Sequence, residues 1–365
     1  MSERYSRQLV LQGFGVRSQN KLSKASILVI GAGGLGCPAL QYFTGVGIGR
    51  IGIVDGDHVS LSNLHRQVLF NTADIGKLKT EVAFQKLTAA NPETIIETFP
   101  FAIKADNCLD LLENYDVILD CSDNFGTRYL LNDACALLNK PLIFAAVSAW
   151  EGQIAVFDNN ENGLRTNYRD LFPNQPGSHE IPNCEENGVI GVLPGVIGTM
   201  QAAEAIKLIT GIRKPLINQL LNYNLLDQSI YIIDILPAPA GSYELPADRI
   251  EFSTRRYQEI SAGTDSDIIE INVEEMHDLI NKGSTIVIDV REIHERPSLS
   301  TKHIQVPMSA FDSSLPDEIN EPNIVLVCQH GIRSLAAAEK LRSKYHGQKN
   351  IYSLAGGIAR WYGQL

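Results

Sequence analysis

The chain has 365 residues, 44% of them hydrophobic and 20% charged, which suits about two or three globular domains. Its formal net charge of -11 argues against a nucleic-acid-binding surface, which needs basic side chains. The N-terminus MSERYSRQLV lacks the apolar core of a signal peptide, and we expect no bilayer-spanning run. These observations predict a cytoplasmic protein with no membrane or nucleic-acid partner. The six cysteines form no C-x-x-C pair, so no zinc site of the usual spacing is expected.

The first 235 residues alternate predicted strands and helices. Residues 26–30 predict a buried strand, 35–46 a helix, and 50–54 a second strand. Further strands are expected at 115–120, 142–146 and 153–157, helices at 124–139 and 195–210, and a hairpin at 216–223 and 228–235. Parallel strands joined by a helical crossover imply an α/β fold with a Rossmann-like, doubly wound sheet.

The composition changes after residue 236. Residues 237–264 contain PAPAGSYELPADR and SAGTDSD, which are rich in proline, alanine, glycine and serine. We therefore predict a linker at 241–265, between a domain over 1–240 and a small α/β domain over 266–365. The small domain is expected to contain the strands IIEI, TIVIDV, NIVLVC and NIYSL, the helices VEEMHDLINKG and 333–345, and a final helix after 356–357.

A glycine-rich turn follows the first predicted strand. Gly31, Gly33 and Gly36 fit G-x-G-x-x-G, whose glycines allow a tight turn, the approach of a phosphate, and close packing of helix on strand. Asp55 ends the second strand, where a carboxylate usually binds a ribose hydroxyl. By themselves these residues fit an NAD-dependent oxidoreductase.

Charged residues around this turn favour a triphosphate. Asn63, Arg66 and Lys79, with Arg7 upstream, would neutralise a leaving pyrophosphate, whereas NAD needs little cationic charge. Asp123 follows a central predicted strand and could either hold Mg²⁺ or cap the next helix.

Residues 1–235 resemble the ubiquitin-activating-type adenylyltransferases of the MoeB, ThiF and HesA family. The resemblance rests on RYSRQ, GAGGLG, DGDHVSLSNLHRQ, GKLK, CSDN with Arg128, and GVLPGVIGTMQAAEAIK, in the family's order. It implies ATP- and Mg²⁺-dependent adenylation of the C-terminal glycine of a ubiquitin-like sulfur carrier that ends in Gly-Gly. Arg66 and Asp123 would be catalytic, Asp123 would bind Mg²⁺, and Arg7 would reach the partner's site in a homodimer.

The nucleotide contacts that this resemblance implies are Gly31, Gly33, Gly34, Gly36, Asp55, Asp57, Ser62, Asn63, Arg66, Lys79, Asp123 and Asn124. Members of the family often bind structural zinc through two C-x-x-C pairs. Here residues 167–170 read NYRD where the first pair falls, so no zinc is expected.

Two cysteines are candidates for sulfur chemistry. Cys328 follows the predicted strand NIVLV and precedes a helix, so loop N–H groups and Arg333 could hold a thiolate or persulfide. Four residues separate Cys328 from Arg333, whereas phosphatases with a similar cysteine loop have five. The smaller loop suits sulfur better than phosphate. Cys184 lies in IPNCEENGVIGVLPG. The family resemblance implies that it can take the carrier's acyl group or form a disulfide-type link to the carrier, and a buried or loop thiol is the alternative.

Residues 266–365 resemble a rhodanese domain, the family of single-cysteine sulfurtransferases, through VIDVRE, CQHGIRS and LAGGIARW. This implies a persulfide on Cys328, supplied by a donor such as a cysteine desulfurase, and a thiocarboxylate product for molybdenum cofactor, thiamine or another thio-compound. The alternatives are an NAD-dependent oxidoreductase with a fused partner-recruiting domain, a C-terminal module that only binds, and adenylation of a small molecule.

Overall fold

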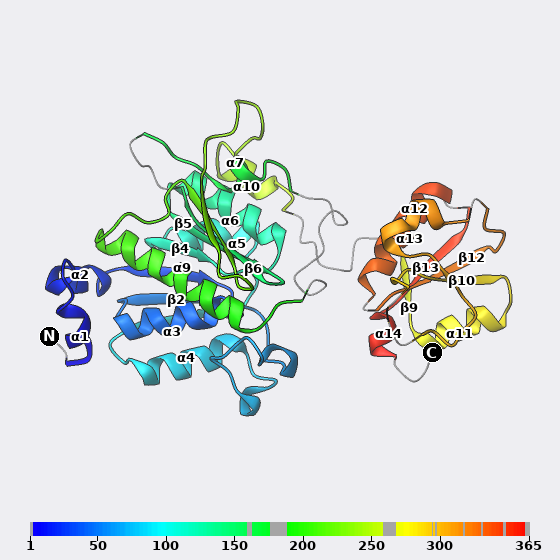
Figure 1. Cartoon of the computed structure of the whole chain (residues 1–365), viewed down its shortest axis with the longest axis horizontal. Helices are drawn as coiled ribbons and strands as arrows, with labels where there is room; N and C mark the ends of the chain where they lie inside the picture. The colour runs from blue at the N-terminus through cyan, green and yellow to red at the C-terminus, as the bar shows by residue number, and fades with distance from the viewer. Residues whose placement is uncertain are drawn as a thin grey trace. The chain divides into compact units, whose positions relative to one another are not determined.

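The computed structural model divides the chain into two compact units, Met1–Ile260 and Ser261–Leu365, each with helices on both faces of one sheet (Figure 1). The structure describes residues 3–158, 163–175, 188–257, 268–293, 295, 298–316, 318–329, 331–345 and 348–361.

The sheet of the first unit has eight strands in the order β3-β2-β1-β4-β5-β6-β7-β8. They are β1 (Ser26–Ile30), β2 (Arg50–Val54), β3 (Ile95–Phe99), β4 (Val117–Asp120), β5 (Leu142–Ser148), β6 (Glu151–Phe157), β7 (Gln219–Asn224) and β8 (Ile230–Asp234). The strands β1 to β5 are parallel, and β6 to β8 continue the sheet antiparallel. The order reverses between β1 and β4, and α/β sheets bind ligands beyond the carboxyl ends of the strands at such a point.

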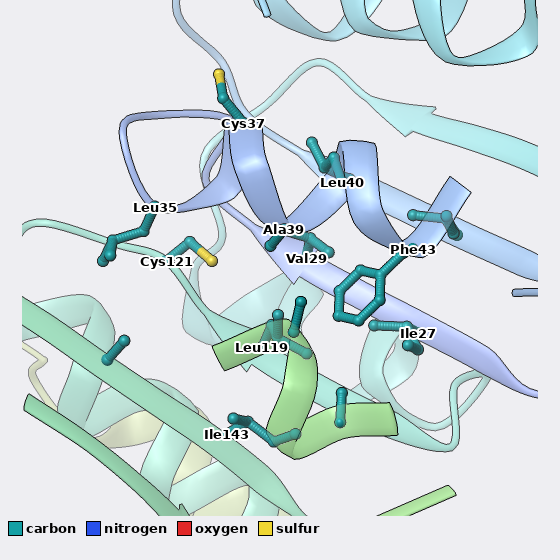
Figure 2. Close-up of a cluster of buried hydrophobic side chains, with 14 of the residues drawn as sticks. Ile27, Val29, Leu35, Cys37, Ala39, Leu40, Phe43, Leu119, Cys121 and Ile143 are labelled. Carbon is teal, nitrogen blue, oxygen red and sulfur yellow. The ribbon is translucent and has the colours of Figure 1, made fainter. Parts of the chain in front are cut away.

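The central strand β1 is buried along its whole length, and its side chains alternate between the two faces. Ile27 and Val29 pack into one cluster, and Leu28 and Ile30 pack into the other. A continuous apolar run is typical of a parallel strand that is covered on both faces. Figure 2 shows the first cluster, in which Ile27, Val29, Leu35, Cys37, Ala39, Leu40, Phe43, Leu119, Cys121 and Ile143 are labelled.

Helices cover both faces, which confirms the predicted doubly wound sheet. The helices of this unit are α1 (Ser6–Leu9), α2 (Gly15–Leu22), α3 (Gly36–Val46), α4 (Lys79–Ala90), α5 (Ala105–Leu112), α6 (Phe125–Leu138), α7 (Tyr168–Leu171), α9 (Val192–Thr210) and α10 (Arg249–Thr254), with the 3₁₀ helices η1 (Glu3–Tyr5), η2 (Leu61–Asn63) and η3 (Thr72–Asp74). The helices α2, α3, α4 and α9 contribute to the first cluster, and α5, α6, α7 and α10 to the second.

Within the described residues, α9 is the one helix with the length and apolar composition of a membrane span, although the sequence predicted no such run. Leu193, Ile197 and Ala205 of this helix are fully buried in the first cluster. A Cβ on Gly198 would lie 2.2 Å from the carbonyl oxygen of Leu35, so the helix packs closely beside α3. Its apolar composition therefore suits a helix of the core.

The stretch predicted as a linker contains α10. Phe252 of this helix is fully buried in the second cluster, and the ring of Tyr257 lies 5.4 Å from the Phe252 ring. The composition of 237–264 did not reveal these contacts, because only a few large side chains in a polar stretch make them. The described chain up to Tyr257 therefore packs with the first unit.

The second unit has an entirely parallel sheet in the order β11-β10-β12-β13-β9. Its elements are β9 (Ile269–Ile271), α11 (Val273–Asn281), β10 (Thr285–Asp289), β11 (Ile304–Gln305), η4 (Met308–Ala310), α12 (Phe311–Ser314), β12 (Asn323–Val327), α13 (Ile332–Tyr345), β13 (Asn350–Leu354) and α14 (Gly357–Arg360). One face packs against α12 and α13 and the other against α11 and α14. The prediction of a second, smaller α/β domain is confirmed.

Candidate active sites

A glycine turn joins β1 to α3 at the point where the strand order reverses. Gly31 has a φ of +99°, which glycine adopts readily, and a Cβ on it would lie 2.8 Å from the carbonyl oxygen of Cys121. A Cβ on Gly36 would lie 2.0 Å from the carbonyl oxygen of Gly31. At Gly33 the nearest atom to an added Cβ is Nε2 of Gln67, 3.9 Å away. None of the described residues is close enough to require a glycine at position 33. A glycine there fits a turn whose backbone a ligand approaches.

Gly34 lies beside two segments that come much later in the chain. A Cβ on it would lie 3.0 Å from Cβ of Pro194 and 3.5 Å from Cδ of Arg66. The glycine turn thus meets both the first turn of α9 and the SNLHRQ segment, as expected if these segments serve one site.

Asp55, the predicted ribose ligand, follows β2 and is held by its surroundings. Its Oδ2 accepts a 2.8 Å hydrogen bond from the Ala32 N–H, and its Oδ1 accepts one of 2.8 Å from the Asp57 N–H. Lys79 Nζ is 3.8 Å from Oδ2. Burial raises the pKa of Asp55, and the Lys79 ammonium opposes that rise. The glycine turn itself therefore positions this carboxylate.

Lys79 is the first residue of α4 and has a side chain that is only 6% exposed. Its Nζ donates a 2.8 Å hydrogen bond to Oδ2 of Asp57, whose side chain is 75% exposed. A sheltered ammonium at the end of β2 suits a phosphate, which would compete with Asp57 for it.

Ser62, Asn63 and Arg66 lie on η2 and the turn after it. Nη1 of Arg66 donates to the carbonyl oxygen of Ser62 at 3.2 Å and lies 2.8 Å from Nε2 of His65. Asn63 and Arg66 are half-buried, and Ser62 is exposed. The guanidinium has no carboxylate partner among the described residues, so its charge is available to an anion.

The helix α6 begins directly after the CSDN segment at the end of β4. Asn124 is its N-cap, and the Asn124 side chain accepts a 2.8 Å hydrogen bond from the Thr127 N–H. Asp123 is exposed, and its carboxylate makes no hydrogen bond or ion pair with a described residue. The sequence left open whether Asp123 caps this helix. Asn124 fills that position, so the Asp123 carboxylate remains available to a cation.

Sequence analysis missed Asp120, the last residue of β4, which is fully buried. Its Oδ1 accepts hydrogen bonds from the N–H and Oγ of Ser122, at 2.9 and 2.6 Å, whereas Oδ2 has no hydrogen-bond partner in the described chain. Burial raises the pKa of Asp120, and the nearby Arg128 guanidinium opposes that rise. A carboxylate inside the otherwise apolar strand VILD was the signal that could have revealed it.

Gln201 of α9 joins two neighbouring strands, β4 and β5. Its Nε2 donates to the carbonyl oxygens of Asp120 and Ile143, at 2.7 and 2.8 Å. Its Oε1 accepts a 3.3 Å hydrogen bond from Sγ of Cys121. A buried polar side chain of the long apolar helix therefore ties the last residue of β4 to the second residue of β5.

In the second unit, Cys328 follows β12 and is 1% exposed. The Gly331 N–H donates to Sγ at 3.1 Å, and Oγ of Ser334 lies 3.5 Å from Sγ. Ser334 Oγ also donates to the carbonyl oxygen of Gly331 and accepts from Ser353 Oγ, at 2.8 and 2.9 Å. The Gly331 N–H can stabilise an anionic sulfur at this position. The one hydroxyl proton of Ser334 is directed to the Gly331 carbonyl oxygen instead.

Arg333, predicted to assist this loop, forms a bidentate ion pair. Its Nη1 and Nη2 donate to Oε1 and Oε2 of Glu295, at 2.6 and 2.8 Å. The Arg333 guanidinium lowers the pKa of Glu295 to about 2, so the pair is charged across the neutral range. Sequence analysis missed Glu295, because nothing local links residues so far apart.

The motif VIDVRE supports the family resemblance, and its arginine also contacts the cysteine loop. Arg291 is 2% exposed and pairs with Asp289 at 2.8 Å, and its Nη1 donates to Oε1 of Gln329 at 3.3 Å. Gln329 is the residue directly after Cys328. The segment 289–295 therefore contacts the cysteine loop at Gln329 and again at Arg333.

The residues at the position of the family's first zinc pair form a hydrogen-bonded cluster. Nδ2 of Asn167 donates to the hydroxyl of Tyr243 at 2.6 Å, and that hydroxyl donates to Oδ1 of Asp170 at 2.8 Å. The Ala238 N–H also donates to Oδ1, at 2.7 Å. No group of three metal-binding side chains occurs in the described chain. These amide, carboxylate and phenol groups do not fit the thiolate site of the family.

Cys184 lies outside the described residues, and Arg7 is exposed on α1. The other cysteines of the first unit, Cys37, Cys108, Cys121 and Cys135, are free thiols in the core. Burial raises the pKa of each of the four, which opposes thiolate formation.

Comparison with known proteins identifies both units. The ThiF family matches residues 5–242, and the rhodanese-like domain matches residues 272–364. The chain is 48% identical over 229 residues to a sulfur carrier protein adenylyltransferase of Thermus thermophilus, across 62% of this chain and 84% of the relative. It is 36% identical over 373 residues to the probable adenylyltransferase/sulfurtransferase MoeZ of Mycobacterium tuberculosis, across 99% of this chain and 93% of that relative.

Among solved structures, E. coli MccB with ATP matches with a TM-score of 0.57 and 25% sequence identity, across 67% of this chain and 75% of that one. Both predicted resemblances are confirmed, and the match along almost the whole chain favours adenylyl transfer over the oxidoreductase alternative. The chain belongs to the ThiF family and, with its rhodanese-like domain, is an enzyme of the adenylyltransferase and sulfurtransferase type.

Proposed function

We propose that the first unit uses ATP and Mg²⁺ to adenylate the C-terminal glycine of a ubiquitin-like sulfur carrier, and that the second unit delivers sulfur to the activated carboxyl group. The adenylyltransferase domain would extend beyond the predicted boundary of 1–240 to include α10. The linker would be correspondingly shorter than 241–265, and 266–365 would be the sulfurtransferase domain.

The nucleotide would bind beyond the carboxyl ends of β1, β2 and β4. The N–H groups of the turn from Gly31 to Gly36 would face the phosphates, and Asp55 would accept the ribose hydroxyl. Arg66 and Lys79 would neutralise the β- and γ-phosphates. The match to MccB with ATP supports this assignment.

Polar residues around the turn would complete the nucleotide site. Asp57, Ser62 and Asn63 would contact the nucleotide, with Asn124 acting through its position at the start of α6. Asp123 would hold Mg²⁺, which neutralises phosphate charge and usually takes only one or two protein carboxylates. The Asp123 carboxylate is exposed and pairs with no residue that the structure describes, which fits that role.

Adenylation is attack of a carrier carboxylate oxygen on the α-phosphorus, with cleavage of the bond to pyrophosphate. The chain's contribution would be to position the two reactants and neutralise the leaving group. The name of the Thermus thermophilus relative, a sulfur carrier protein adenylyltransferase, supports a carrier as substrate.

Sulfur transfer would start from a persulfide on Cys328. Its outer sulfur would attack the acyl carbon of the adenylate and release AMP, and a second thiolate would then cleave the S–S bond to free the thiocarboxylate. Cys184 is our candidate for that thiolate or for an acyl intermediate. The resulting disulfide would need a thiol reductant.

We further propose a homodimer in which Arg7 completes the partner's site, a cysteine desulfurase as sulfur donor, and work in the cytoplasm. The relatives with both activities favour the supply of sulfur for molybdenum cofactor, with thiamine or another thio-compound as the alternative.

One observation carries the adenylation proposal: Gly33, whose face is open, follows β1, and Asp123, whose carboxylate pairs with no described residue, follows the neighbouring strand β4, where the strand order reverses. ATP–pyrophosphate exchange with a Gly-Gly carrier tests it, with Asp123→Asn and a matched control, Asp106→Asn, which removes an exposed carboxylate from α5. We expect carrier-dependent exchange that Asp123→Asn lowers by about 100-fold or more and Asp106→Asn leaves intact. Exchange without any carrier would instead indicate a small-molecule substrate.

A further inference from the structure

Two arginines next to the Cys328 loop are each bound by a carboxylate. Glu295 holds both terminal nitrogens of Arg333, at 2.6 and 2.8 Å. Asp289 holds Arg291 at 2.8 Å, and both of these side chains are almost fully buried. The sequence suggests a loop with a cation for an anionic ligand, but in the structure this charge is already balanced.

The groups that do contact the sulfur are neutral. Sγ of Cys328 receives the Gly331 N–H at 3.1 Å and lies 3.5 Å from Oγ of Ser334. Among the described residues, the Gly331 N–H is the group that donates to the sulfur, and one neutral donor suits a single negative charge. It offers little compensation for a donor molecule that brings two further charges into a buried site.

Possible sulfur donors differ in charge. Thiosulfate is a compact dianion, and its binding needs cations that are free to turn toward it. An alkyl or protein cysteine persulfide carries one charge, on its outer sulfur. A carboxylate that occupies the guanidinium beside the loop therefore penalises thiosulfate more than it penalises a persulfide.

We propose that Glu295 determines donor specificity: by pairing with Arg333 it disfavours small dianionic donors such as thiosulfate and leaves cysteine persulfides as the donor class. The inference rests on the proposed persulfide role of Cys328. Glu295 acts through Arg333 and is a positioning residue. Arg333 is two residues beyond Gly331, whose N–H contacts the sulfur, and the released guanidinium of Arg333 would have to turn toward a donor there.

The transfer step balances for both donors. The Cys328 thiolate attacks the outer sulfur of the donor, the donor's S–S bond breaks, and Cys328 becomes a persulfide. The electron pair of the broken bond leaves with sulfite when thiosulfate is the donor and with a thiolate when a persulfide is the donor. The two donors differ only in the charge that the site must bind before sulfur is transferred.

The test loads the full chain with thiosulfate or with the persulfide of N-acetylcysteamine and follows Cys328 persulfide by mass spectrometry. We expect Glu295→Gln to lower KM for thiosulfate about tenfold and to change KM for the alkyl persulfide less than about twofold. Added salt should reduce the gain, because it screens the released charge. The double variant Glu295→Gln/Arg333→Ala should lose the gain.

The matched control is Glu292→Gln, which removes the same charge from a carboxylate that Ser309 Oγ contacts at 2.9 Å. It should leave both KM values unchanged. An unchanged thiosulfate KM in Glu295→Gln, or an equal gain in Glu292→Gln, overturns the inference. Absence of Cys328 persulfide with either donor overturns the proposed sulfur role itself.

Discussion

The backbone N–H of Ala32 donates a 2.8 Å hydrogen bond to Oδ2 of Asp55. This bond joins the glycine turn after β1 to the end of β2, so the two parts of the proposed nucleotide site are fixed to each other by the chain itself. Because these segments are already held in place, less conformational entropy is lost when a ligand binds.

Replacement of Asp55 tests this arrangement. Asparagine has one side-chain oxygen, whereas Asp55 accepts hydrogen bonds from both Ala32 and Asp57. One N–H therefore loses its acceptor in Asp55→Asn. We expect the free energy of unfolding to fall by about 1–3 kcal/mol and ATP to bind more weakly. Urea unfolding and calorimetric titration with ATP measure both, and a variant equal to the parent in both would contradict this account.

Two glycines of the turn should respond differently to alanine. In Gly36→Ala the new Cβ would lie 2.0 Å from the Gly31 carbonyl oxygen, so we expect at least about 1–3 kcal/mol of destabilisation. In Gly33→Ala it meets nothing closer than 3.9 Å, so stability should change by less than about 0.5 kcal/mol while ATP affinity falls about tenfold. If Gly33→Ala keeps full affinity, phosphates do not approach this position.

Asp158 should make stability depend on pH. Burial raises its pKa to about 8, with Arg165 opposing that rise. Between about pH 4 and pH 8 the folded state therefore binds more protons than the unfolded state, and the free energy of unfolding falls as pH rises. Asp158→Asn removes this titration, and asparagine tolerates the positive φ of +55° at this position.

We expect Asp158→Asn to vary less in stability between pH 5 and pH 8 and to exceed the parent at pH 8. Urea unfolding at several pH values measures this. Asp110→Asn, which alters a carboxylate that is 82% exposed, serves as the control. If the free energy of unfolding of Asp158→Asn and of the parent changes with pH in the same way, this explanation is wrong.

The cluster of Asn167, Asp170 and Tyr243 should stabilise the first unit without metal. We expect a strong zinc chelator to leave Tm unchanged, and Tyr243→Phe to lower the free energy of unfolding by about 1–2 kcal/mol. The control is Tyr231→Phe, because Tyr231 is 64% exposed on β8. Loss of stability on chelation, or one bound zinc per chain, would contradict the metal-free cluster.

The sequence predicted the features that depend on local pattern. The apolar run of β1 and the glycines after it predicted a buried strand and a tight turn. In the structure, Gly31 has a positive φ, and Gly36 leaves no room for a Cβ. A predicted strand followed by a cysteine and a predicted helix likewise indicated the Cys328 loop. In each case the cause lies within a few neighbouring residues.

Features that depend on distant pairs were not predictable in the same way. Glu295 meets Arg333 across 38 positions, and Asn167 meets Tyr243 across 76. The choice of Asn124 over Asp123 as the helix cap depends on a shift of one residue, which no pattern resolves. Such contacts are set by how the sheets bring segments together, and a single sequence carries little trace of them.

The close approach of Gly331 to Gly356 has a practical consequence for handling the protein. Beside that contact, the N–H groups of Ile358 and Ala359 donate to the carbonyl oxygens of Cys328 and Gln329, at 2.9 Å each. The helix α14 is thus part of the backbone scaffold around the Cys328 thiol. Truncation before Ile358 would remove two donors from that loop, and a purification tag or fusion partner is better attached at the other end of the chain.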